Sequence, residues 1–188
     1  MASDYKVNAG RRLLMDRMAE FGRELGHQQD VLEVGIAGDK DSHGQPCPGA
    51  NREFFSYATY TTLDKWPDLH PNIVGDLCDP ILCATLANRF DLVICSQVLE
   101  HVWDIHAAAR GLYTMTRPGG VCIVDTPFGS PWHADTAQGG DYWRLTRQGM
   151  GKLLTQAGFG AVRVSEITNP HTGALEVVSA LACKIEVS

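Results

Sequence analysis

The chain has 188 residues and a formal net charge of −6, with 44% hydrophobic and 20% charged residues. This is the composition of an ordinary globular protein that is large enough to bury a substantial core. The acidic balance argues against a broad phosphate-binding face, and no apolar run approaches the roughly 20 residues that cross a bilayer. The first residues also lack the apolar stretch of a signal peptide. We therefore expect a cytoplasmic protein with neither a nucleic-acid nor a membrane partner.

An amphipathic helix is expected over residues 9–25, because apolar side chains recur there on one face at helical spacing. After it, short apolar runs that are typical of buried strands mostly alternate with stretches of helical period. Strands are expected at 31–36, 57–63, 72–76, 91–96, 121–125, 161–167 and 175–185. Further helices are expected at 81–88, 104–115 and 146–157.

This alternation predicts an α/β fold with a doubly wound, mostly parallel seven-stranded sheet. The last two strands have no helix between them, so we expect an antiparallel hairpin and an antiparallel edge strand there. A single domain is expected over 1–188, with the N-terminal helix in 1–28 and the α/β core in 29–188. Ligands of such sheets bind beyond the carboxyl ends of the strands, where the strand order reverses.

Acidic residues stand at or near the ends of the first three predicted strands. Glu33, Asp64 and Asp76 stand at corresponding positions, and Gly35 lies beside the first of them. A carboxylate at such a position can accept two hydrogen bonds from a vicinal diol or pair with an ammonium group. Each acid alone could equally be a solvated strand end or a helix cap. Together, after apolar strands, they favour the rim of a cofactor site.

Several segments resemble the class I S-adenosylmethionine (SAM)-dependent methyltransferases, and in particular the small generic domains of the methyltransferase type 11 group. The resemblance covers about residues 30–160 and rests mainly on 31–38, 75–77, 90–102 and 117–120, of which 90–102 is the most specific. It implies the Rossmann-like methyltransferase fold and SAM as the cofactor. The cofactor-binding residues that it implies are Glu33, Gly35, Ala37, Asp64, Asp76, Leu77, Ser96 and Gln97.

The acceptor side of the site is harder to predict, because methyl transfer needs a base only when the nucleophile carries a tightly held proton. His101 and His133 are the candidate catalytic residues, although His101 could instead hold a loop. Asp135, Tyr142 and Arg144 are the candidate substrate-binding residues. For Arg144 the alternative is a salt bridge with Asp141.

No metal site is expected. Six cysteines are present without a Cys-x-x-Cys pair, so we expect reduced, mostly buried thiols rather than a zinc site. His133 and Asp135 with a third ligand such as Asp141 or His43 could bind a divalent metal, but their spacing is nonspecific.

We expect methyl transfer to a small-molecule acceptor, such as a hydroxyl of a sugar or of a secondary metabolite. A second subunit could complete the acceptor pocket, so a homodimer is one expected state. A nicotinamide-dependent oxidoreductase is disfavoured, because its glycine fingerprint is absent. A non-catalytic methyltransferase-like binding or scaffold subunit stays open, because Ala37 and Asp39 stand where the family usually has glycine.

Overall fold

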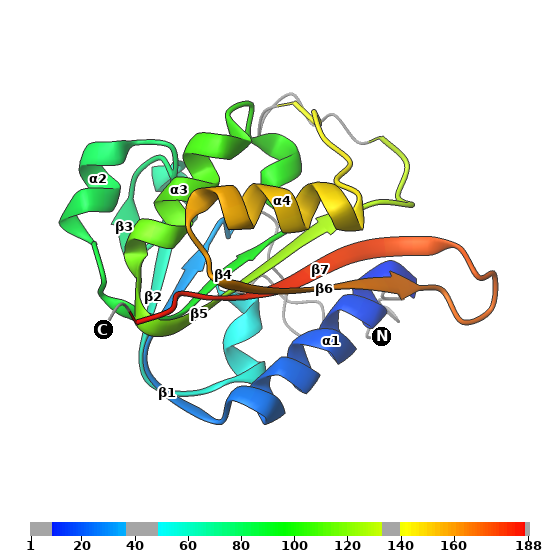
Figure 1. The fold of residues 1–188 in the computed structure, drawn as a ribbon, viewed down its shortest axis with the longest axis horizontal. Coiled ribbons are helices and arrows are strands. Elements are labelled where there is room, and N and C mark those ends of the chain that lie inside the picture. The colour runs from blue at the N-terminus through cyan, green and yellow to red at the C-terminus, as the bar shows by residue number, and fades with distance from the viewer. Residues whose placement is uncertain (1–8, 37–48, 133–139, 187–188) are drawn as a thin grey trace, which may run out of the picture.

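The computed structural model describes residues 9–36, 49–132 and 140–186. One seven-stranded sheet crosses the molecule, with helix α1 on one face and helices α2, α3 and α4 on the other (Figure 1). The strands are β1 (His27–Val34), β2 (Ser56–Asp64), β3 (Ile73–Val74), β4 (Phe90–Ser96), β5 (Thr116–Pro127), β6 (Ala161–Thr168) and β7 (Leu175–Cys183). The α-helices are α1 (Ala9–Leu25), α2 (Pro80–Thr85), α3 (Ile105–Met115) and α4 (Arg147–Ala157), and the 3-10 helices are η1 (Ala50–Phe54), η2 (Pro67–Leu69) and η3 (Leu99–His101).

The strand order is β3-β2-β1-β4-β5-β7-β6. Strands β1 to β5 pair in parallel, whereas β7 is antiparallel to both β5 and β6. The predicted fold class and the predicted terminal hairpin are confirmed, with β7 lying inside the sheet and β6 forming its outer edge. The order reverses between β1 and β4, so the carboxyl ends of these two strands mark the expected ligand-binding crevice.

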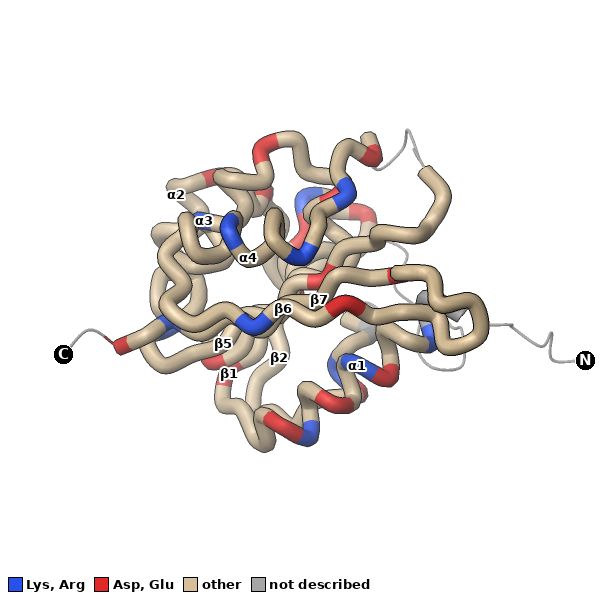
Figure 2. Tube along the Cα trace, turned by 45° about the vertical axis from the view of Figure 1, so that its right-hand side comes forward, with Lys and Arg blue, Asp and Glu red and all other residues tan. Residues whose placement is uncertain are grey.

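The two faces of the sheet carry cores of different size. The larger core lies under α2, α3 and α4, and the smaller one forms where Met18 and Phe21 of α1 pack on Leu92 and Ile123 of the sheet. The predicted amphipathic helix is thus confirmed. Basic and acidic residues alternate along its outer side (Figure 2).

The predicted elements differ from the observed ones mainly at their ends. The helix predicted over 81–88 stops at Thr85, and Asn88 takes a left-handed φ of 56° while its N–H donates to the carbonyl of Thr114. The strand predicted over 121–125 begins at Thr116, because that residue already pairs with Phe90 of β4. The helix caps behaved as local rules predict, since the carboxylate of Asp104 accepts a hydrogen bond from the third residue after it.

Five cysteines lie in the described residues, and all five are free thiols: Cys78, Cys83, Cys95, Cys122 and Cys183. Three of them are buried, as expected for Cys95 and Cys122, while Cys183 is half-buried. Cys47 lies outside the described residues. Among the helices of the described segments, none combines the length and the hydropathy that a membrane-spanning helix requires.

Candidate functional site

The end of β1 is a buried acidic turn. The carboxylate of Glu33 is 1% exposed and accepts hydrogen bonds from the Tyr60 hydroxyl, at 2.7 Å, and from the side-chain amide of Asn51. Two residues later, Gly35 adopts a left-handed φ of 78°. A Cβ on Gly35 would lie 2.2 Å from a methyl group of Val98, so only glycine lets the turns after β1 and β4 touch.

Asp64 joins two neighbouring turns at the end of β2. Its Oδ2 accepts a hydrogen bond from the N–H of Ile36, at 2.8 Å, and its Oδ1 accepts one from the N–H of Trp66, at 2.9 Å. Each oxygen keeps a second lone pair for another donor. Asp64 therefore shapes the turn after β1 and could also hold a ligand.

The register of the strands brings these residues into one row. Val34 of β1 pairs with Leu63 on one side and with Cys95 on the other, so Gly35, Asp64 and Ser96 follow at the same level. Neighbouring strands are about 4.8 Å apart. The row therefore crosses three strands at the crevice where the strand order reverses.

Asp76 and Leu77 follow β3 at the next position along this edge. Asp76 is exposed, and its Oδ1 accepts a hydrogen bond from the N–H of Cys78 at 2.8 Å. The side chain of Leu77 is 5% exposed and belongs to the larger core. Asp76 can thus offer its second carboxylate oxygen to a ligand, whereas the side chain of Leu77 is used for packing.

Gln97 makes a strained turn at the end of β4. It has a φ of 57°, and its N–H donates to the carbonyl of Asp125 at 2.9 Å. Its side-chain Nε2 is buried and donates to no group among the described residues. A buried amide without an acceptor is costly, so this donor is available to a ligand. Ala37, His133 and Asp135 lie outside the described residues.

His101 holds the segment that precedes α4. The Nδ1–H of His101 donates to the carbonyl of Gly140 at 2.8 Å, and the N–H of Tyr142 donates to the carbonyl of Glu100 at 2.7 Å. Nε2 of His101 lies 3.8 Å from the Glu100 carboxylate. This geometry shows the loop-holding role that was the alternative for His101.

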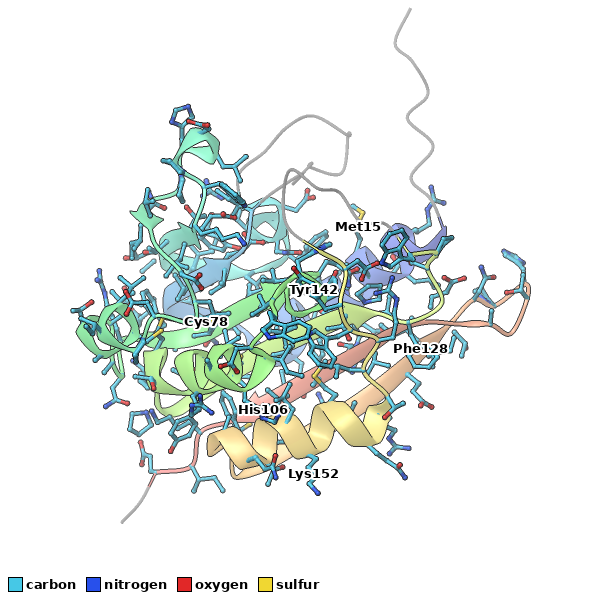
Figure 3. All side chains as sticks on the ribbon, turned by 90° about the horizontal axis from the view of Figure 1, so that it is seen from above. Met15, Cys78, His106, Phe128, Tyr142 and Lys152 are labelled. Carbon is cyan, nitrogen blue, oxygen red and sulfur yellow. The ribbon has the colours of Figure 1, made fainter. Side chains whose placement is uncertain are left out.

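Tyr142 lies between Cys78 and Phe128 when the molecule is viewed as in Figure 3. Its ring meets the edge of Trp103, with centroids 5.4 Å apart, and both side chains are exposed. Arg144 uses both terminal nitrogens to bind the two oxygens of the buried Asp141 carboxylate. The salt bridge considered for Arg144 is therefore present, and an anionic ligand would have to share this guanidinium.

Two buried carboxylates near this edge were not predicted as site residues. Burial raises the pKa of Glu100 to about 8 and that of Asp125 to about 7. Asp125 ends an apolar run of the fifth strand, so the rule that selected Glu33 would also have selected it. Nothing local signals Glu100, because its burial depends on the segment 140–145 that lies over η3.

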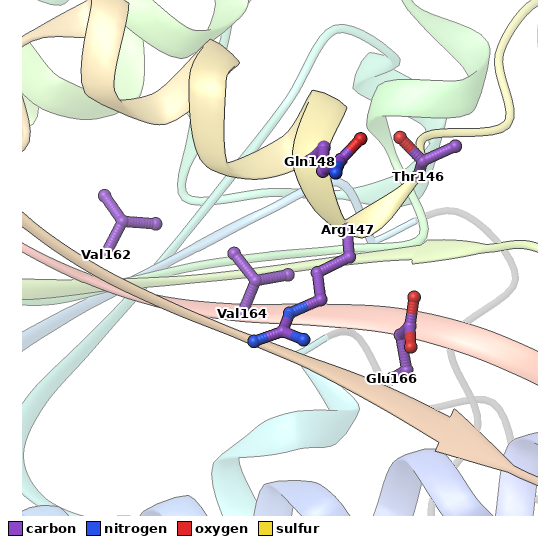
Figure 4. A pocket seen from close by; sticks show the side chains of 6 residues that line it. All are labelled: Thr146, Arg147, Gln148, Val162, Val164 and Glu166. Atoms are coloured by element: carbon purple, nitrogen blue, oxygen red, sulfur yellow. The ribbon is translucent and has the colours of Figure 1, made fainter.

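A surface hollow of about 570 Å³ lies elsewhere, between the start of α4 and the outer strand β6 (Figure 4). Its lining contains none of the residues predicted for the cofactor or the acceptor, and consists of Thr146, Arg147, Gln148, Val162, Val164 and Glu166. Over the described parts of the chain, no group of three or more His, Cys, Asp or Glu side chains is arranged to hold a metal ion.

Comparison with known proteins identifies relatives of several kinds. Two curated ubiquinone biosynthesis O-methyltransferases, from Psychrobacter cryohalolentis and Psychrobacter arcticus, are each 44% identical over 45 residues. That segment is 24% of this chain and 18% of theirs, so the similarity spans less than a fifth of those relatives.

Among solved structures, the N-methyltransferase NodS from Bradyrhizobium japonicum WM9 has a TM-score of 0.65 at 18% identity, covering 95% of this chain and 98% of NodS. The 1,6-didemethyltoxoflavin-N1-methyltransferase from Burkholderia thailandensis has a TM-score of 0.63 at 16% identity, covering 92% of this chain and 78% of that enzyme. At such identities the likeness shows the fold.

The family follows from a model described as "Methyltransferase domain", which matches residues 7–163 and so most of the chain. This confirms the SAM-dependent methyltransferase family expected from the sequence, and with it SAM as the cofactor. The chain belongs to the methyltransferase domain family.

Proposed function

We propose that this chain transfers the methyl group of SAM to an oxygen of a small-molecule acceptor, such as a hydroxyl of a sugar or of a secondary metabolite. One observation carries the proposal. Gly35, Asp64 and Ser96 stand level at the crevice between β1 and β4, with acids on the strands beside them. This is where a doubly wound sheet binds its ligand.

The donors and acceptors at this edge fit the groups of SAM. Glu33 is assigned to the ammonium group, Asp64 to the ribose hydroxyls and Asp76 to the amine of adenine, each as a hydrogen-bond acceptor. The unpaired Nε2 of Gln97 supplies a donor for the carboxylate of the methionine part. Gly35 supports close backbone approach, because it lacks a side chain and has a positive φ.

SAM supplies an activated methyl group on a sulfonium, which is a good leaving group. The residues of this chain therefore have to orient the acceptor, exclude water and take up the acceptor's proton. His101, His133, Asp135, Tyr142 and Arg144 remain assigned to the acceptor side. Within that set, Tyr142 supports contacts to a ring of the acceptor, because its ring and that of the neighbouring Trp103 are both exposed.

The choice of oxygen rests on the short Psychrobacter match, since those relatives are O-methyltransferases. NodS and the toxoflavin enzyme are N-methyltransferases, so the shared fold does not select the acceptor atom. A screen with radiolabelled SAM against phenols, sugars and amines will identify the atom.

Calorimetry with SAM and S-adenosylhomocysteine is the direct test of the cofactor site. Micromolar binding of either is the expected result. If neither binds to a protein whose circular dichroism shows it folded, the methyltransferase proposal fails and the scaffold alternative takes its place.

A further inference from the structure

The buried polar atoms without a partner gather in one part of the molecule. Across the described residues, every buried side-chain nitrogen or oxygen that lacks a hydrogen bond belongs to one of six residues. Arg17 belongs to α1. The other five lie in the turn and η3 that follow β4, on β5 or on β7, and they are Gln97, Glu100, Asp125, Thr126 and Ser179. Native structures contain few such atoms, and a cluster of them at a ligand-binding edge indicates a bound polar molecule.

Asp125 stands in a polar row that continues the row of the cofactor crevice. In the register of the sheet it pairs with Ser96 of β4 and with Ser179 of β7, and Ser179 pairs in turn with Ser165 of β6. Each residue of the row on β4, β5 and β7 is two positions from Ile94, Ile123 or Leu181, so it lies on the same face of its strand. Those three side chains pack in the core under α1, so the row faces α1. It is therefore a polar row at the end of an otherwise apolar face.

The carboxylate of Asp125 is fully buried and incompletely bound. Burial raises its pKa, while the hydroxyls of Ser179 and Ser96 and the charge of Arg17 oppose that rise. Neither serine completes a hydrogen bond of ordinary geometry with the carboxylate. The guanidinium of Arg17 donates instead to Ser165, at 3.0 Å, and to Glu20, at 2.8 Å. Both oxygens of Asp125 are thus ready to accept hydrogen bonds from a ligand.

We propose that Asp125 is a catalytic residue that accepts the proton of an acceptor hydroxyl at the carboxyl end of β5. This inference rests on the proposed function, since Asp125 lies about 10 Å, or two strands, from Gly35 of the cofactor crevice. The acceptor O–H bond breaks and its proton passes to Asp125. The oxygen's electron pair forms the new bond to the methyl carbon, the methyl–sulfur bond breaks, and its electron pair stays on sulfur.

The charges at this edge favour a hydroxyl over an amine. Asp125 and Glu100 bring four unpaired carboxyl oxygens, against two unpaired donor nitrogens, on Arg17 and Gln97. Carboxylates stabilise an ammonium ion, which has no lone pair with which to attack. A hydroxyl is neutral, keeps its lone pairs and gains from a base that accepts its proton.

Asp125 is also better suited to this step than its titratable neighbours. Glu100 lies under the segment 140–145, and His101 already donates its Nδ1–H to that segment. In the described residues the other charged or titratable groups that interact with Asp125 are Arg17 from α1, Cys95 from β4 and Cys122 from β5. A base with a pKa of about 7 is matched to proton uptake near neutral pH.

The test compares Asp125→Asn with Asp91→Asn. Asp91 is also a buried aspartate of the sheet, 5% exposed, but it lies at the start of β4. Asp125→Asn is expected to bind SAM within about 3-fold of the unmodified protein and to lower kcat for the best hydroxyl acceptor by about 10²-fold or more. The rise of kcat/KM through about pH 7 should disappear with it. Asp91→Asn is expected to keep the kcat per folded molecule and the pH profile.

If Asp125→Asn does not fold, the second variant is Asp125→Ser, which would continue the row of serines. The proposal is overturned if the variant that folds keeps the kcat and pH profile of the unmodified protein. It is also overturned if the chain binds SAM but methylates no phenol, such as catechol, and no sugar, such as methyl glucoside, whether or not it methylates amines such as ethanolamine. Absence of SAM binding would instead overturn the proposed function itself, so the two failures are distinguishable.

Discussion

The two ends of the same sheet treat buried polar groups in opposite ways. At the amino end of β5, the ammonium of Lys184 donates to the side-chain oxygen of Asn88 and to the carbonyls of Tyr113 and Thr116, at 2.7 to 2.9 Å. Asp91 lies at that end too, where it accepts a backbone hydrogen bond from Asp30 and pairs with an arginine of β5. Every one of these buried charges is matched by partners of the chain itself.

At the carboxyl end, the side chains of Glu100 and Asp125 and the Nε2 atom of Gln97 are also buried, but they lack hydrogen-bond partners in the described residues. An unpaired buried polar group costs stability, whereas a fully paired one does not. The amino end is therefore built to hold the fold, while the carboxyl end keeps unsatisfied groups for a ligand.

The largest expected effect is on the pH dependence of stability. Burial raises the pKa of Asp125 from 3.8 to about 7 and that of Glu100 from 4.5 to about 8. The folded state therefore holds these protons after the unfolded chain has lost them. Stability from both groups is complete below about pH 4 and is lost as the pH rises through 7 and 8. Between pH 5 and pH 8, ionisation of each carboxyl should lower the free energy of unfolding by about 3 kcal/mol.

Urea unfolding at pH 5 and pH 8 measures this loss. The double variant Asp125→Asn with Glu100→Gln should show a much smaller difference between the two pH values than the unmodified protein. An equal difference in both proteins would mean that the buried acids at the carboxyl end cost no more stability than those at the amino end.

Lys184→Met should have the next largest effect. As expected for the amino end, that effect should be on stability and not on SAM binding. It leaves three oxygens without their donor, which costs about 3 kcal/mol of unfolding free energy. SAM affinity, measured by calorimetry on the folded fraction, should not change. Lys152→Met on the exposed side of α4 is the matched control and should be nearly neutral. A loss of SAM affinity in Lys184→Met would break the division between the two ends.

Asp64→Ala should weaken SAM binding by roughly 1.5–3 kcal/mol, because it removes charge-assisted hydrogen bonds at the crevice. It also frees the N–H of Ile36, so some stability is lost as well. Asp64→Asn keeps an acceptor oxygen and separates the two effects. Calorimetry with S-adenosylhomocysteine is the measurement, and unchanged affinity in both variants would contradict the assignment of Asp64 to the ribose.

The smallest effect should come from Thr146→Ala. The Thr146 hydroxyl accepts a hydrogen bond from the N–H of Gly149 at 3.1 Å and caps α4 near the carboxyl end of the sheet. Because this group is satisfied, it should act structurally despite its location. We expect a loss of about 1 kcal/mol in unfolding free energy with unchanged SAM affinity. Thermal unfolding with and without SAM will show whether that separation holds.

By itself, the sequence determined the features that depend on neighbouring residues. Apolar runs indicated the strands, and helical spacing indicated α1. The helices predicted over 104–115 and 146–157 begin with Asp104 and Thr146, which cap α3 and α4. The acids at the carboxyl ends of β1, β2 and β3 could be assigned to one edge, because parallel strands end on the same side. These signals are local, and a periodic pattern of side chains is enough to carry them.

Only the tertiary structure decided which of these residues meet. The insertion of β7 between β5 and β6 sets Ser179 beside Asp125, 54 positions earlier in the chain. Lys184 finds its partners through the same register, and Glu100 is buried by a segment some 40 residues away. Strand register and long-range packing depend on complementary surfaces rather than on local pattern. That is why the sequence indicated a cofactor edge, while the unpaired carboxylates beside it became visible only in the folded chain.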